Sequence, residues 1–136
     1  MSQKVYVLLF FVFCSFFSYS QSEKELYREA LSYMSAKDYA KAYSIMDKLY
    51  SKKHKNEDYL FTLGLICLNY PERKERAVEI FEALSQKRKD ILEMKYYLGK
   101  AYHINYKFNE AIPLLQEFIN NFASIKKPNE EQNAML

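Results

Sequence analysis

Gly64-Leu65-Ile66-Cys67 has one counterpart 34 residues earlier, Ala30-Leu31-Ser32-Tyr33, and another 35 residues later, Gly99-Lys100-Ala101-Tyr102. A second small residue stands 12 or 13 positions beyond the first residue of each copy, at Ala42, Ala77 and Ala111. Both glycines of the 136-residue chain therefore occupy the same position of a repeat. A period of this length is typical of arrays of stacked helical units.

This unit resembles the tetratricopeptide repeat, a helix–turn–helix unit in which a small residue on helix A faces a small residue on helix B. The resemblance covers roughly residues 23–123. Leu63-Gly64 and Leu98-Gly99 match the family's Leu-Gly pair, and Tyr33 and Tyr102 match its aromatic residue. The departures are Glu29-Ala30 in place of Leu-Gly, Cys67 in place of the aromatic residue, and no proline closing helix B.

The resemblance implies an all-α solenoid with one repeat domain over 21–128 and repeats at about 23–56, 57–91 and 92–125. We expect helices at 23–35, 39–53, 57–69, 72–87, 91–104 and 108–122, and the start of a fourth-repeat or capping helix within 129–136. Three N-cap boxes support these starts, at Ser22 with Glu25, Asp90 with Glu93, and Asn129 with Gln132.

Two prolines bear on where the helices begin. Pro71 suits the first turn of the fourth helix, because an N–H group is not needed there. Pro113 would cost about 3 kcal/mol in a helix interior. We therefore expect the sixth helix to begin late, near Asn109, or to bend at Pro113.

Composition excludes several other classes of protein. Two Gly, three Pro and 23 Tyr plus Phe (13 Tyr and 10 Phe) argue against a β-sandwich and against a disordered linker. The cysteines are Cys14 and Cys67, too few for a disulfide framework or a Cys-based zinc site. A formal net charge of +3 is too small to indicate a nucleic-acid partner.

The first twenty residues have the three parts of a secretory signal peptide. Lys4 lies in a short n-region, residues 5–17 carry no charge, and Ser18-Tyr19-Ser20 offers a cleavage site before Gln21. The apolar run is shorter than the ~20 residues that span a bilayer, so we expect cleavage after Ser20. An alternative is an uncleaved leader or a lipidated Cys14, although Phe13 stands where a small residue is expected.

No catalytic pattern is present, and the sequence predicts no enzyme activity, no cofactor and no metal site. His54 and His103 lie in no known catalytic or metal-binding motif. Cys67 falls at a packing position, which favours an inert buried thiol.

Basic clusters recur at the ends of the three B helices, at Lys52-Lys53-His54-Lys55, Lys87-Arg88-Lys89 and Lys126-Lys127. Cations there complement the helix dipole. The alternative is a basic edge that faces an acidic partner or an anionic membrane surface.

The candidate site is the concave groove that helix A lines in the tetratricopeptide family. One groove position is aromatic in every repeat, and the next turns of the same face continue it. The candidate groove residues are Tyr27, Leu31, Met34, Phe61, Leu65, Leu68, Tyr96, Lys100 and His103. An amphipathic helix or an extended peptide could bind there, with the aromatic residues as hot spots. Alternatively, the rings merely pack between adjacent A helices.

The expected function is therefore that of an exported scaffold that binds a protein or peptide partner. The leader and the stretches 113–119 and 126–130 also resemble the N-terminal part of Bacteroidetes envelope proteins, in which such repeats precede a β-propeller and an OmpA-like domain. This weaker resemblance implies a periplasmic or outer-membrane-associated assembly.

A last expectation concerns the C-terminal end. Residues 129–136 offer only Ala134, Met135 and Leu136 to cover the apolar surface of the sixth helix. We therefore expect a longer parent chain, or self-association through this end.

Overall fold

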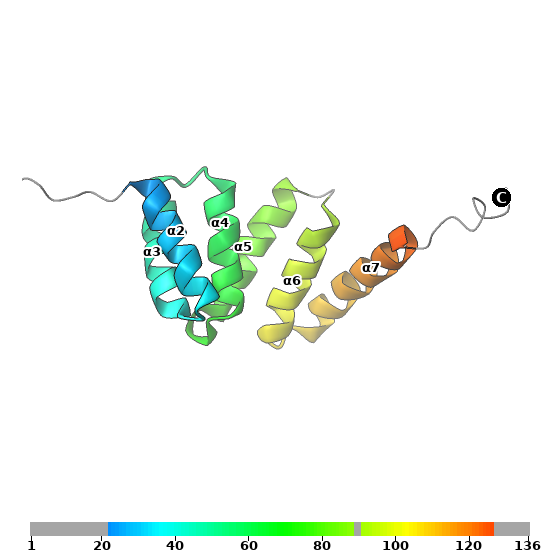
Figure 1. Ribbon diagram of the computed structural model, residues 1–136. Coiled ribbons are helices and arrows are strands. Elements are labelled where there is room, and N and C mark those ends of the chain that lie inside the picture. Colours follow the sequence, from blue (N-terminus) through cyan, green and yellow to red (C-terminus); the bar gives the residue numbers. More distant parts are fainter. Residues whose placement is uncertain (1–21, 89–90, 127–136) are drawn as a thin grey trace, which may run out of the picture.

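The computed structural model describes residues 22–88 and 91–126, and this part of the chain is all-α, as the sequence predicts. Six α-helices and one 3₁₀ helix stand side by side from α2 to α7 (Figure 1). They are α2 (Glu23–Ser35), α3 (Tyr39–Lys52), α4 (Glu57–Leu68), η1 (Pro71–Arg73), α5 (Lys74–Lys87), α6 (Leu92–Ile104) and α7 (Phe108–Lys126). The expected leader, Cys14 and the helix expected within 129–136 lie outside the described residues.

Each α-helix packs mainly on the helices that precede and follow it along the chain. The first helix of each successive pair is called an A helix here (α2, α4 and α6), and the second a B helix (α3, α5 and α7). One continuous apolar core runs through the array, and its largest fully buried side chains include Phe81, Met46 and Leu49. No helix among the described residues is long and apolar enough to cross a membrane.

Small residues allow the A and B helices to approach closely, as the repeat pattern predicts. A Cβ atom on Gly64 would lie 2.9 Å from Ile80 Cγ2 and 2.9 Å from Phe81 Cζ, both on α5. A Cβ atom on Gly99 would lie 2.8 Å from Leu115 Cγ on α7. The remaining small residues of the pattern are all buried, namely Ala30, Ala42, Ala77 and Ala111.

The turns inside the first and third pairs have the same backbone geometry. Lys37 and Tyr106 both have φ of 61°, in the left-handed region. In each turn two backbone N–H groups donate back to carbonyl groups at the end of the preceding helix. In the first pair Lys37 donates to Met34, and Asp38 donates to Tyr33. In the third pair Tyr106 donates to His103, and Lys107 donates to Tyr102. This arrangement is a standard helix C-terminal motif, here without the usual glycine.

The second pair differs because its turn holds the additional residue of that repeat. We expected Pro71 in the first turn of the fourth helix. It instead begins the 3₁₀ helix η1, and α5 starts only at Lys74. The physical reason for Pro71 still holds, because the first residue of a 3₁₀ helix likewise needs no N–H partner.

Side-chain caps fix several helix starts. The Ser22–Glu25 capping box at α2 is confirmed, with both reciprocal hydrogen bonds present. α6 begins at Leu92 with Ile91 at its N-cap, and Asp90, the capping residue of the second predicted box, lies outside the described residues. Asp38 caps α3 and Asn56 caps α4. The capping-box pattern does not predict these two caps, because neither residue has Glu or Gln three residues later.

Pro113 lies inside α7, which begins at Phe108, one residue from the start expected at Asn109. The helix continues to Lys126, four residues beyond the expected end. Asn109, whose carbonyl would have accepted the missing Pro113 N–H, is exposed. Water can therefore satisfy that carbonyl, which reduces the cost of the proline.

Ion pairs join the start of the A helix to the end of the B helix in the first two pairs. Lys53 Nζ lies 2.6 Å from Glu23 Oε2, and Arg88 Nε lies 2.9 Å from Glu57 Oε2. The two ion pairs occupy equivalent positions of the repeat. The basic residues at the ends of the B helices therefore hold the two helices of a pair together, besides interacting with the helix dipole. In the third pair Leu92 and Phe122 stand at the corresponding positions.

Candidate functional site

The nine candidate groove residues all lie on the A helices, but with different exposure. Leu68 is buried, with 7% of its surface exposed, so the expectation that it lines a groove is wrong. His103 is exposed. The other seven are half-buried, namely Tyr27, Leu31, Met34, Phe61, Leu65, Tyr96 and Lys100.

Tyr27 packs against the next A helix. Its ring stacks on Tyr59 with centroids 5.3 Å apart, and its hydroxyl forms a 3.1 Å hydrogen bond with the hydroxyl of Thr62. Thr62 is buried, so this bond satisfies a polar group inside the α2–α4 contact. Tyr27 therefore has a packing role, as the alternative interpretation of the rings expects.

Phe61 belongs to an aromatic cluster of α4, α5 and α6. Its ring meets Tyr97 edge-on at 5.2 Å and Phe81 edge-on at 6.0 Å. Phe81 and Tyr97 in turn stack at 5.4 Å. Edge-on and stacked pairs of this kind add stability beyond the area they bury.

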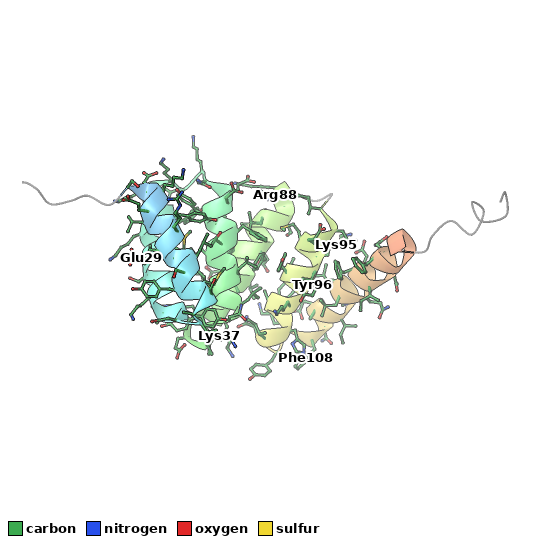
Figure 2. All side chains as sticks on the ribbon, in the orientation of Figure 1. Glu29, Lys37, Arg88, Lys95, Tyr96 and Phe108 are labelled. Atoms are coloured by element: carbon green, nitrogen blue, oxygen red, sulfur yellow. The ribbon has the colours of Figure 1, made fainter. Side chains whose placement is uncertain are left out.

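The ring of Tyr96, on α6 (Figure 2), packs against α7. Its ring lies 5.1 Å from Phe118, which stacks on Phe122 at 5.7 Å. Among the described residues no ring contact joins Tyr27, Phe61 and Tyr96 to one another. Phe61 and Tyr96 are linked through Tyr97, whose ring lies 5.2 Å from each of them, whereas Tyr27 contacts neither.

Leu31, Leu65 and Lys100 occupy one repeat position and remain half-exposed. Lys100 forms no ion pair with the described residues. His103 lies beside Phe108, with ring centroids 5.5 Å apart. These side chains give the A-helix face an apolar part on α2 and α4 and a polar part on α6.

A cavity of about 320 Å³ lies elsewhere, between α5, α6 and α7. Its lining residues are Ser85, Arg88, Ile91, Met94, Lys95, Leu98 and Leu114, and none of the nine candidates is among them. Arg88 and Lys95 lie toward the same end of the molecule (Figure 2). Both cations are occupied, since Arg88 binds Glu57 and Lys95 binds Glu117.

Sequence reasoning missed the residues that immobilise the candidate rings, namely Tyr59, Thr62 and Tyr97. One signal was available, because Thr62 and Tyr97 occupy equivalent positions 35 residues apart. The cavity could not be found in this way, because its lining combines side chains from three helices.

Little in the described residues suggests reaction chemistry. Burial raises the pKa of the Cys67 thiol to about 12, so it is protonated and unreactive near neutral pH. Burial and the hydrogen bond that its hydroxyl donates to Glu82 raise the pKa of Tyr102 to about 12. No group of three or more His, Cys, Asp or Glu that could hold a metal ion occurs among residues 22–88 and 91–126.

Neither a scan of protein-family models nor a search of curated proteins finds a match to this chain.

Proposed function

We propose that the chain is a tetratricopeptide-type solenoid that binds a partner protein or peptide along its A-helix face. Three features recur at the repeat spacing and support the proposal. They are the close A–B contacts at Gly64 and Gly99, the matching turns at Lys37 and Tyr106, and the ion pairs Glu23–Lys53 and Glu57–Arg88. A solenoid of this kind acts by presenting an extended surface.

The exposure of Leu31, Leu65 and Lys100 carries the binding proposal. This position stays half-exposed in all three pairs, although Leu65 also packs against the core. Two leucines followed by a cation favour an amphipathic helix or extended peptide with apolar anchors and an acidic end. No turnover is proposed.

The binding test replaces Leu31 and Leu65 together with Glu. A partner captured from an envelope extract is identified, purified and titrated against the parent chain and the variant. Loss of two central anchors costs at least about 2 kcal/mol, which is about a thirtyfold weaker affinity. The matched control is Ala83→Glu, an exposed position on α5. Equal affinity for the parent and the double variant, with both folded by circular dichroism, would refute the proposed face.

We also propose that the protein is exported and works in an envelope-associated assembly, with residues 1–20 removed. Intact mass of the exported protein should correspond to a chain that begins at Gln21. A membrane-bound product that retains Met1, or carries a lipid on Cys14, would instead favour the anchored alternative.

A further inference from the structure

Exposed large apolar side chains gather at one end of the array. Six such residues occur in the described part of the chain, and only Ile91 lies outside the segment from residue 106 to 122. The other five are Tyr106, Phe108, Ile112, Ile119 and Phe122. Ile112 is 63% exposed and Ile119 is 56% exposed, which is unusual for isoleucine on a helix with a packed side.

Four of these residues lie on α7 and form a regular stripe along it together with Leu115, which is half-exposed and also lies against Gly99 on α6. Phe108, Ile112, Leu115, Ile119 and Phe122 are spaced four, three, four and three residues apart. That spacing is the pattern of a seam between two helices that pack along their length. We call this set the α7 stripe.

The repeat shows what normally covers this side of a B helix. Val78 on α5 is equivalent to Ile112, 34 residues earlier, and α6 packs on α5. Val78 is only 6% exposed, against 63% for Ile112. The α7 stripe thus presents the surface that the next A helix would cover, and within the described residues α7 packs mainly on α6.

We propose that the α7 stripe binds the α7 stripe of a second copy of this chain, as a two-fold antiparallel helix pair. The stripe reads Phe, Ile, Leu, Ile, Phe in both directions, so a two-fold axis near its middle places similar side chains against each other. Its neighbours Asn109, Gln116 and Asn120 are uncharged, so no like charges oppose the pairing.

Other occupants fit the stripe less well. A membrane surface favours cations on the polar face of a helix, but α7 carries Glu110 and Glu117 and no cation before Lys126. The segment 127–136 is too polar to cover the α7 stripe well. At the repeat positions where α6 has Met94, Tyr97 and Leu98, that segment has Asn129, Gln132 and Asn133, 35 residues later.

The test measures the mass of the full chain by light scattering and sedimentation over a wide concentration range. Association through one helix pair is small in area, so the mass should rise reversibly from monomer to dimer with concentration. The double variant Ile112→Glu/Ile119→Glu should remain monomeric and keep its helical circular dichroism. Glu110→Lys changes the charge at an exposed position on the side of the same helix away from the stripe and should dimerise like the parent. Any association through the leader is common to all three proteins.

Four results would overturn the proposal. One is a constant monomer mass for the parent chain, and another is a double variant that associates as the parent does. The third is a parent that dimerises only after deletion of 127–136, which would identify that segment as the occupant. A mass that increases beyond the dimer would indicate head-to-tail stacking and would exclude the two-fold pair.

Discussion

At the scale of single residues, the two glycines differ in how tightly their surroundings are packed. Gly64 faces Phe81 and Ile80, which are 0% and 5% exposed and have no space to move. Gly99 faces Leu115, which is half-exposed and can change rotamer. The same sequence position is therefore held more tightly in the second pair than in the third.

We predict that Gly64→Leu and Gly99→Leu both destabilise the fold and that Gly64→Leu does so more. Forcing methylenes into a packed helix contact costs about 1–3 kcal/mol. Thermal melts should show midpoints lowered by several degrees, with the larger shift for Gly64→Leu. Ala83→Leu, at an exposed position on α5, should stay within about 0.5 kcal/mol of the parent. An unchanged midpoint for both glycine variants would show that the A–B contacts are misassigned.

At the scale of helices, much of the architecture could be predicted from sequence. Capping by Ser22 and the spacing of small residues placed helix starts within two residues, because both signals act locally. Pro71 was misplaced because a 3₁₀ turn and the first turn of an α-helix use proline in the same way. The end of α7 was missed because no capping residue marks it in the sequence.

The candidate site was predicted less well than the helices. Helical spacing puts Leu31, Leu65 and Lys100 at one repeat position, and all three are half-exposed in the structure. It could not show that Tyr59 and Tyr97 pack against Tyr27 and Phe61, because those contacts cross between helices of different repeats. We therefore expect alanine at Tyr27 or Phe61 to lower stability besides any effect on binding.

A pH prediction concerns the ion pair that closes the second pair of helices. The hydrogen bond from Arg88 lowers the pKa of Glu57 below its ordinary value. A carboxyl with a lowered pKa stabilises the fold above its unfolded-state pKa, and this contribution disappears as pH falls through the folded-state value. Glu57→Gln should therefore lower the urea midpoint near neutral pH, and the difference from the parent should shrink in acid.

Urea unfolding at about pH 7 and about pH 3 measures this difference, with the two conditions on either side of the ordinary glutamate pKa. Glu79→Gln removes an exposed carboxyl of α5 that forms no ion pair with the described residues, and serves as the control. A Glu57→Gln deficit that is equally large at both pH values would argue against the ion pair.

At the scale of the whole molecule, burial is unevenly distributed. Helix α4 buries seven residues, whereas Ala111 is the one buried residue among 108–122. In stacked repeats each unit is stabilised by its own packing and by its neighbours, so a unit with one open side is the weakest. The third pair should therefore open more easily than the second.

Native-state hydrogen exchange should show this order. Amides of α7 should exchange faster than those of α4 and α5, because their opening exposes less apolar surface. The measurement is made at low concentration and repeated with Ile112→Glu/Ile119→Glu, so that association does not protect α7. Uniform protection across α4, α5 and α7 would mean that the array unfolds as a single unit.

The longer turn between α4 and α5 has a practical consequence. It holds five residues, 69–73, against three in each of its counterparts, 36–38 and 105–107, yet α5 still reaches the contact at Gly64. Pro71 and Glu72 are both exposed, so added length there disturbs no buried side chain. An epitope or a fluorescent-dye tag could be inserted between these two residues, which would allow the protein to be followed in living cells with both termini left untouched.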